Sequence, residues 1–480
     1  MGSISRRRFL QSSAALASVG ALAACGSSGG GKTASGDAGP LSWWDHFGPL
    51  QPLQKKTFAK FAKAKGGVQV DYTWRNASKM GQALQLAKQS NQLPDVTSLA
   101  GLNIPVPALI KAGWLQPLEL NSAATDRLKG ALINGVHIFD GSVYNFPIFS
   151  PRQYSAANWF NIDLLKKADV DPDAPPGTYD EFRSAATAIQ KQGKGTYGWI
   201  WNVGMPDRMG SQVDDMAQAA GFEGGGGVLY RTGEYAYHSD PYVNVIEFLV
   251  SLQKDKLLFP GSTSFSDKIA RARWVTGVAG FYFDGPWCPG AALQDSKDFA
   301  TSLGVGPMLV PEKGTPVTGY RGVSGGPFFI TKTAKNTEAA NLLLSDFFTV
   351  EDYYIGVANA MDQPPRDLDA VAKSSAHKAY KKLIKMFDGQ VFHAPVAVVR
   401  NADITKVLAE TQTITPALGD IVQGALTGDV TDIRGSLKTL SDKSSAAREK
   451  AIKAATAKGA KVSMDDYVFS DWKPRTDYQQ

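Results

Sequence analysis

The fold is decided by the segment from residue 41 to residue 99, which reads LSWWDHFGPLQPLQKKTFAKFAKAKGGVQVDYTWRNASKMGQALQLAKQSNQLPDVTSL. Apolar side chains alternate within its short β-prone stretches and recur at helical spacing between them. The predicted elements are, in order, a strand at 41–44, a helix at 53–65, a strand at 68–74, a helix capped by Ser78 and a strand at 96–99. This β-α-β-α-β order predicts a parallel sheet covered by helices, in which ligands bind at the carboxyl ends of the strands.

The rest of the chain continues this mixture of strands and helices. A capping box begins at Thr178, residues 275–283 and 328–330 are β-prone, and residues 339–348 are apolar at helical spacing. After about residue 370 the sequence becomes mainly helical. The sequence predicts an α/β protein with a helical C-terminal region, and its 480 residues are enough for two or three domains of roughly 100–200 residues each.

Residues 1–24 have the pattern of an export signal. Arg6, Arg7 and Arg8 precede a modestly apolar stretch that is too short to span a bilayer. The pattern resembles a twin-arginine signal with Gln11 in place of the usual lysine, so the twin-arginine and general secretory routes both stay open. Leu22-Ala23-Ala24-Cys25 resembles the lipobox of bacterial lipoproteins, which predicts cleavage before Cys25 and lipidation of its thiol. We therefore expect an exported protein that is anchored by lipid to the outer face of the cell membrane.

The segment from Cys25 to residue 39 predicts a flexible tether, because it is rich in Gly and Ser. Residues 26–33 satisfy the phosphate-loop expression, but no strand precedes them and no helix follows, so they do not predict a nucleotide site. The 51 Lys and Arg against 45 Asp and Glu give a net charge of +6, half of which belongs to the signal. No basic stripe is present, which argues against a nucleic-acid partner. Cys288 would be a lone thiol, expected as a small buried side chain.

A set of short motifs in a fixed order resembles the extracellular solute-binding proteins of ABC importers, in particular the carbohydrate-binding group. The motifs run through nearly all of the chain after the tether. They are LSWWDH at 41–46, PDV at 94–96, AGWLQPL at 112–118, DGSVYNFP at 140–147, WFN at 159–161, LLKKADV at 164–170, PPGTYDEF at 175–182, GVAGF at 277–281, GPW at 285–287, GG at 325–326, AA at 339–340 and QPP at 363–365. The GVAGF motif departs from the Gly-x-x-Ala-Met that relatives often carry.

The resemblance implies a two-lobe periplasmic-binding-protein-like fold with a multi-strand hinge, which closes on a solute between the lobes. On this chain the first lobe would comprise 40–149 plus 325–372, and the second 150–324 plus 373–480. The protein would be a monomeric, non-enzymatic receptor that needs no cofactor or metal and delivers a mono- or oligosaccharide to the transmembrane subunits of an ABC permease. The equilibrium between the open and closed arrangements shifts only as far as the solute prefers the closed one.

Sugar sites need planar aromatic side chains for the C–H faces of the ring and hydrogen-bonding groups for its hydroxyls. We expect such groups in the loops at strand ends and at the hinge crossings. The candidates are Trp44, Asp45, His46, Asn76, Ser98, Arg152, Tyr154, Trp201, Asp284, Trp287, Gly325, Gly326, Arg366 and Arg400. Strand alternation would leave Trp199 in the core and Trp201 free to stack, and relatives often stack their solute on the tryptophan equivalent to Trp287.

Two alternatives stay open from the sequence. If two of Arg152, Arg366 and Arg400 converge, the solute would be an anionic polyol such as a glycerophosphodiester, because arginine binds phosphate and carboxylate bidentately. A secreted glycoside hydrolase would need a pair of suitably spaced carboxylates, which the sequence does not locate. Gly322-Val-Ser324-Gly-Gly326 fits the nucleophile-elbow expression, but a strand-like segment follows it where an elbow needs a helix. The five histidines are isolated, which argues against a zinc site.

Overall fold

The computed structural model describes residues 39–480. The predicted signal peptide at 1–24 and the predicted lipid attachment at Cys25 lie outside the described residues, as does the predicted tether apart from Gly39. Within residues 39–480, no helix combines the length and the apolar character that crossing a bilayer requires.

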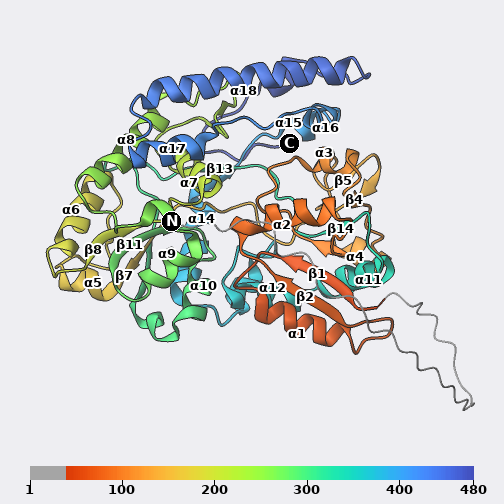
Figure 1. Ribbon diagram of the computed structural model, residues 1–480, viewed down its shortest axis with the longest axis horizontal. Coiled ribbons are helices and arrows are strands. Elements are labelled where there is room, and N and C mark those ends of the chain that lie inside the picture. Colours follow the sequence, from red (N-terminus) through yellow and green to blue (C-terminus); the bar gives the residue numbers. More distant parts are fainter. Residues whose placement is uncertain (1–38) are drawn as a thin grey trace, which may run out of the picture. The chain divides into compact units, whose positions relative to one another are not determined.

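Two large sheets organise residues 39–480 (Figure 1), and we call the parts around them the first and second lobes. The first sheet has the strand order β2-β1-β3-β14-β4. Its strands are β1 (Leu41–Asp45), β2 (Val70–Trp74), β3 (Val96–Thr97), β4 (Leu115–Gln116) and β14 (Phe329–Thr331). β1 is parallel to β2 and β3, which confirms the predicted β-α-β-α-β unit, whereas β14 is antiparallel to β3 and β4.

Helices of the first lobe pack on this sheet through an aromatic core. They are α1 (Gln51–Phe61), α2 (Ala77–Gln89), α3 (Val106–Lys111), α4 (Ser122–Arg127), α11 (Thr337–Phe347) and α12 (Glu351–Ala360). Trp43 is fully buried, and its ring centroid lies 5.1 Å from those of Phe58 and Phe348. α2 is capped by Asn76, whose side chain accepts from the N–H of Ser78. The predicted cap at Ser78 is therefore wrong by two residues.

The second sheet has the order β12-β7-β11-β8 and is mixed, because β11 is parallel to β8 and antiparallel to β7. Its strands are β7 (Ala157–Asn161), β8 (Tyr197–Ile200), β11 (Ala279–Asp284) and β12 (Leu303–Gly306). The helices of this lobe are α5 (Ile162–Lys167), α6 (Tyr179–Gln190), α7 (Pro206–Ala219), α8 (Asp240–Lys254), α9 (Asp267–Trp274) and α10 (Cys288–Asp295). The capping box at Thr178 is confirmed, with Glu181 as its acidic member. Cys288 is a buried free thiol, as expected.

The chain passes between the lobes at 144–156, 322–328 and 361–377. The first and third of these crossings are hydrogen-bonded to each other. The N–H of Ser150 donates to the Pro364 carbonyl at 2.9 Å, and the N–H of Arg366 donates to the Ile148 carbonyl at 2.7 Å. Beside them, β13 (Gly319–Arg321) pairs in parallel with β15 (Val391–His393). These paired segments form the multi-strand hinge.

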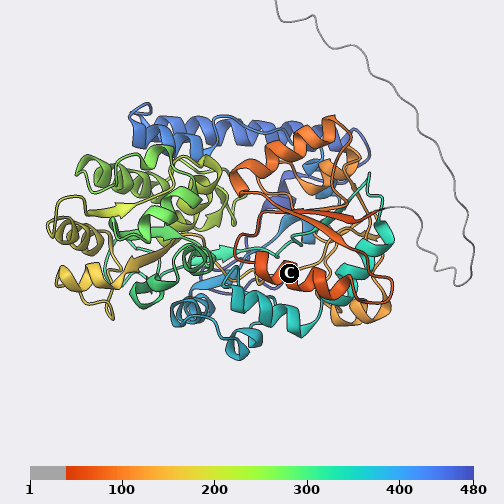
Figure 2. The same ribbon diagram turned by 60° about the horizontal axis from the view of Figure 1, so that its bottom comes forward.

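The C-terminal region is mainly helical, as predicted, and contacts both lobes. Its elements are α13 (Asp369–Lys373), α14 (Lys378–Gln390), α15 (Ala397–Arg400), α16 (Ile404–Leu408), α17 (Leu418–Thr427), α18 (Ile433–Thr456) and the 3₁₀ turn η3 (Met464–Tyr467). α17 packs on α7 of the second lobe, whereas α16 packs on α3 of the first. α18 extends alongside both lobes (Figures 1 and 2).

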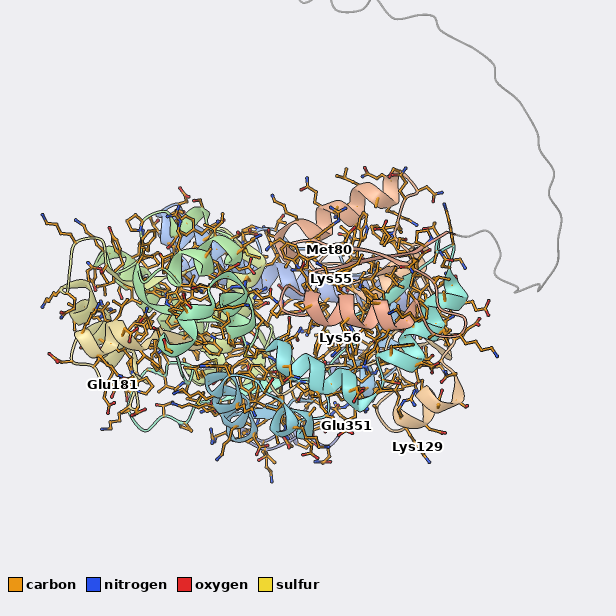
Figure 3. All side chains as sticks on the ribbon, turned by 90° about the horizontal axis from the view of Figure 1, so that it is seen from below. Lys55, Lys56, Met80, Lys129, Glu181 and Glu351 are labelled. Atoms are coloured by element: carbon orange, nitrogen blue, oxygen red, sulfur yellow. The ribbon has the colours of Figure 1, made fainter. Side chains whose placement is uncertain are left out.

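The remaining elements are short. They are β5 (Ile138–Phe139), β6 (Ser142–Val143), β9 (Gly224–Gly225), β10 (Val228–Leu229), η1 (Ser262–Ser264) and η2 (Lys297–Ser302). Charged side chains of both signs, such as Lys55 and Glu351, point outward, whereas Met80 is fully buried (Figure 3).

Candidate functional site

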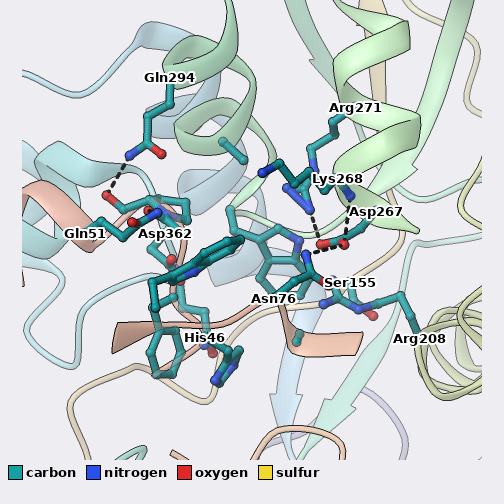
Figure 4. Close-up of a pocket in the computed structure, with 18 of the residues that line it drawn as sticks. His46, Gln51, Asn76, Ser155, Arg208, Asp267, Lys268, Arg271, Gln294 and Asp362 are labelled. Carbon is teal, nitrogen blue, oxygen red and sulfur yellow. Dashed lines mark hydrogen bonds and ion pairs between the residues drawn. The ribbon is translucent and has the colours of Figure 1, made fainter. Parts of the chain in front are cut away.

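A cavity of about 440 Å³ lies between the two lobes, against the hinge (Figure 4). Its lining comes from three places. The first lobe supplies the loop after β1 and the β2–α2 junction, the second lobe supplies α7, α9 and α10, and the hinge supplies residues 153–155, Arg321, Asp362 and Gln363. A site of this kind can bury most of the surface of a small solute.

The wall from the first lobe is built at the carboxyl ends of the parallel strands, as the β-α-β-α-β pattern predicts. His46 follows β1, and its Nδ1 lies 2.8 Å from Oγ of Ser98, which follows β3. Trp74 ends β2 and Asn76 caps α2. Burial, with a smaller contribution from the charge of Arg208, lowers the pKa of His46 to about 3. The imidazole is therefore neutral at physiological pH and can donate or accept one hydrogen bond.

The wall from the second lobe is an ionic network around Asp284, which is fully buried. Its Oδ2 lies 3.2 Å from Nε of Arg271, and its Oδ1 lies 3.5 Å from Nη1 of Arg208. Arg271 also forms an ion pair with Asp267 one helical turn away. Burial acts to raise the pKa of Asp267, but the charges of Arg271 and Arg208 outweigh it and hold that pKa below its usual value. Asp267 therefore carries a full negative charge.

Trp287 is oriented by the same network. Its Nε1 donates to Oδ1 of Asp284 at 2.7 Å, and the guanidinium of Arg208 lies 4.4 Å from its ring centroid. The ring packs over Gly285, where an added Cβ would stand 2.4 Å from ring carbons. A residue larger than glycine at 285 would displace the ring. The indole is thus held in a fixed position at the cavity wall.

The floor of the cavity is formed by the hinge. Nε2 of Gln153 in the first crossing donates to Oε1 of Gln363 in the third at 2.8 Å. Asp362 is 2% exposed, and its Oδ1 accepts from the N–H of Gln363 at 2.8 Å. Burial raises the pKa of Asp362 to about 7. The carboxyl group can therefore act both as a donor and as an acceptor near neutral pH.

Three contacts cross the mouth of the cavity from one lobe to the other, and we call them the rim contacts. Nδ2 of Asn76 donates to Oδ1 of Asp267 at 3.2 Å, as drawn in Figure 4. Nζ of Lys268 lies 5.4 Å from the ring centroid of Trp74. Nε2 of Gln294, near the end of α10, donates to the carbonyl of Pro49 at 3.1 Å.

Among the residues predicted from the sequence, His46, Asn76, Tyr154 and Trp287 line this cavity. Tyr154 is only 1% exposed, and its hydroxyl donates to Oε1 of Gln390. Ser98 and Asp284 lie directly behind the lining, where they hold His46 and Trp287. The structure thus brings these six residues together.

Three other predicted residues pack away from the cavity lining. Trp44 lies beneath the guanidinium of Arg75, whose carbon is 4.0 Å from the ring centroid. Asp45 is fully buried and accepts from Nε1 of Trp43 and the hydroxyl of Tyr72. Trp201 is fully buried and donates to Gln212. The expectation that alternation leaves Trp201 free is wrong, because residues two apart on a strand point to the same face, and the rings of Trp199 and Trp201 pack together in the core.

The three predicted arginines do not converge. Arg152 is paired with Asp477 near the C-terminus, and Arg366 donates to the carbonyl of Arg127. Arg400 lies over the ring of Phe469, 3.6 Å from its centroid. These positions correct the idea that they form a common anion site. Gly325 faces open space, and Gly326 of the second crossing packs against the backbone of Phe146 in the first.

Sequence reasoning missed several lining residues, namely Trp74, Arg208, Lys268, Arg271, Gln294 and Asp362. The position of Trp74 in the lining could have been predicted from the sequence, because Trp74 ends a predicted strand two residues before Asn76. Asp362 directly precedes the QPP motif at 363–365. Within residues 39–480, no group of three or more His, Cys, Asp or Glu side chains is arranged to hold a metal ion.

The fold and the site define a two-lobe binding protein. The family model for bacterial extracellular solute-binding proteins matches residues 45–354, and the chain belongs to this family. Members are binding proteins, so the chain is a solute-binding protein and not an enzyme, as the sequence predicted. No curated protein sequence matches the chain.

Solved structures with the same fold cover most of the chain. An ABC transporter solute-binding protein from Thermotoga lettingae, bound with α-D-tagatose, is 19% identical over 90% of this chain and 100% of its own, with a TM-score of 0.62. The GacH receptor of Streptomyces glaucescens, solved unliganded and with acarbose, is 16% identical over 86% of this chain and 98% of its own, with a TM-score of 0.64. Maltose-bound MalE3 of T. maritima is 22% identical over 84% of this chain and 99% of its own, with a TM-score of 0.61. The predicted two-lobe α/β fold is confirmed.

Proposed function

We propose that this solute-binding protein captures a carbohydrate in the cavity between its lobes and delivers it to an ABC permease. The observation that carries the proposal is the pair of tryptophans in the cavity lining, Trp74 on the first lobe and Trp287 on the second. Indole rings stack on the C–H faces of sugars. The tagatose, acarbose and maltose complexes of proteins with this fold support the same solute class.

Hydrogen-bonding groups around the two rings suit the hydroxyls of a sugar. The amides of Gln51, Asn76, Gln153 and Gln294 and the carboxyl of Asp362 all line the cavity. Amides can both donate and accept hydrogen bonds, and so can a carboxyl group that is partly protonated. These groups can therefore bind a sugar hydroxyl whether the hydroxyl donates or accepts. From the sequence-predicted set, His46, Asn76, Tyr154 and Trp287 are the proposed direct contacts.

The rest of the proposal concerns how the protein is placed and how it moves. Cys25 would carry the lipid, and residues 26–39 would let the folded part reach the permease as a monomer. The lobes would comprise 40–149 plus 325–372 and 150–324 plus 373–480, and would close on the solute by rotating about the crossings. Binding favours the closed arrangement by as much as the solute prefers it.

A thermal-shift screen tests the solute class. Glucose, maltose, raffinose, tagatose and glucuronate are each added to the full-length protein. A sugar at 100 times its dissociation constant stabilises the fold by about 2.7 kcal/mol, which gives a clear rise in melting temperature. W287A should abolish the rise, whereas the matched control W114A, outside the cavity lining, should keep it. A panel in which no sugar raises the melting temperature would overturn the proposed solute class.

A further inference from the structure

The three arginines of the cavity lining differ in how they are paired. Arg271 forms an ion pair with Asp267, and Arg321 forms one with Asp215. Arg208 lies in the first turn of α7, and its side chain reaches toward the centre of the residues drawn in Figure 4. Its Nη1 is buried and has no hydrogen-bond partner in the described part of the chain. Of these three described side chains, only Arg208 donates no hydrogen bond to a carboxylate of the protein.

The nearest carboxylate to Arg208, that of Asp284, is already engaged. Its Oδ1 lies 3.5 Å from Nη1 of Arg208, which is longer than a normal hydrogen bond. The same oxygen accepts from Nε1 of Trp287 at 2.7 Å and from the N–H of Gly285 at 2.9 Å. A carboxylate oxygen has two lone pairs in its plane, so Oδ1 has no further position for a short bond from Arg208. Asp284 attracts Arg208 but does not satisfy its N–H groups.

The guanidinium of Arg208 is oriented by an aromatic ring. Its carbon lies 4.4 Å from the ring centroid of Trp287, and that indole is itself fixed by Asp284. A guanidinium held in this way loses little side-chain entropy when it binds, and its planar fork matches a carboxylate through two parallel hydrogen bonds. All three side chains belong to the second lobe, so this arrangement does not depend on the rim contacts.

The charges on the second-lobe wall favour one anion. The wall carries three positive side chains and two negative ones, namely Arg208, Lys268, Arg271, Asp267 and Asp284. Asp295 also lines the cavity, but it is exposed at the end of α10, where solvent screens its charge. In the hinge, the raised pKa of Asp362, about 7, limits the negative charge of that carboxyl group. One carboxylate of a solute would balance the positive excess of the wall.

We propose that Arg208 binds a carboxylate of the solute, so that the protein takes an acidic sugar such as a uronic acid in preference to its neutral counterpart. The sugar part of this inference rests on the proposed function, whereas the carboxylate site at Arg208 does not. A neutral sugar presents a hydroxymethyl group in place of the carboxylate. That group cannot replace two charge-assisted hydrogen bonds.

Titration calorimetry with matched pairs tests the preference on the full-length protein. The pairs are glucose with glucuronate, galactose with galacturonate and mannose with mannuronate. In at least one pair the acid should bind on the order of tenfold to a hundredfold more tightly than the neutral sugar. R208Q, which keeps an amide but loses the charge, should remove this preference, and R208K, which keeps the charge without the fork, should retain part of it. The matched control R273Q changes an exposed arginine of α9 outside the lining and should keep the whole preference.

The outcomes separate this inference from the proposed function. Equal or tighter binding of the neutral sugars would overturn the acidic preference and leave the carbohydrate proposal standing. A preference that survives in R208Q, or that R273Q removes equally, would overturn the role of Arg208. Succinate, a carboxylate without a sugar ring, tests the site alone. Succinate binding that R208Q abolishes, when no sugar binds, would uphold the carboxylate site and overturn the carbohydrate class, and binding of neither would overturn both.

Discussion

Asp362 is a residue whose protonation should govern part of the pH dependence of stability. Burial raises its pKa from 3.8 to about 7, so the folded state binds a proton that the unfolded state releases. This contribution to the free energy of unfolding is present below about pH 4 and is lost as the pH rises toward 7. The slope is at most about 1.4 kcal/mol per pH unit.

We therefore expect D362N to reduce the loss of stability between pH 5 and pH 8. Urea unfolding at both pH values measures this difference. D295N, at an exposed acid of the cavity rim, is the control and should keep the slope of the parent protein. An unchanged slope in D362N would show that Asp362 does not take up the proton.

Trp201 lies on the same face as Trp199, because residues two apart on a strand point the same way, so the predicted difference between the two is wrong. Both Trp199 and Trp201 are fully buried, and Nε1 of Trp201 donates to Oε1 of Gln212 at 3.0 Å. We expect W201A to lower the free energy of unfolding by about 3–5 kcal/mol, as truncation of buried aromatic side chains does. W287A, at a partly exposed position, should lower it by less. Denaturant midpoints of the two variants check the order, and equal losses would contradict it.

The role of a residue was predictable where its side chain directly follows the end of a strand. It was not predictable where a contact with a residue distant in the sequence determines the position of the side chain. His46 and Asn76 follow parallel strands, so the order of elements alone places them at the cavity. Arg152 was also placed at the first crossing, but its guanidinium pairs with Asp477, more than three hundred residues later. No local sequence pattern encodes that ion pair. The sequence also does not encode that α7 and α9 meet at the cavity, because they come from separate parts of the chain.

At the scale of elements, the C-terminal tail (residues 468–480) is bound along the segment after β15. Asp477 accepts from the N–H of His393 at 2.8 Å, the N–H of Tyr478 donates to the carbonyl of His393 at 2.9 Å, and Gln480 donates to Ala394. Arg152 of the first crossing also pairs with Asp477. The tail thus joins β15 to the first crossing of the hinge.

Deletion of residues 477–480 should lower the melting temperature by several degrees, because it removes these hydrogen bonds and leaves Arg152 without its carboxylate. Calorimetric melting of the truncated and full-length proteins measures the loss. R152A removes the ion pair and the hydrogen bond from Arg152 to the Val391 carbonyl but keeps the other tail contacts, and it should account for part of the loss. A truncated protein with unchanged melting would show that the tail adds nothing to the hinge.

Elements were predicted well where periodicity was strong, as in the three parallel strands and the Thr178 capping box. The start of α2 was misplaced because Asn76 and Ser78 are both good N-caps, and only the backbone decides between them. The antiparallel pairing of β14 with β3 joins residues more than two hundred positions apart, which periodicity does not encode.

At the scale of the whole molecule, the proposed lipid attachment at Cys25 predicts where the protein is found. C25S should move the protein from the membrane fraction to the soluble fraction of the producing cell, because a diacylglycerol anchor is lost. Immunoblots of the separated fractions measure this. C288S, at a thiol in the core, is the control and should stay with the membrane. Equal distribution of both variants would contradict lipidation.

The positions of the tryptophans give the protein an optical property. Of its ten tryptophans, six are fully enclosed in the cores, whereas Trp74 and Trp287 line the cavity from opposite lobes. Solute entry changes the polarity around only these two indoles, against a constant background from the enclosed rings. Intrinsic emission near Trp74 and Trp287 is therefore a label-free signal of occupancy, and phenylalanine at either position separates the contribution of each lobe.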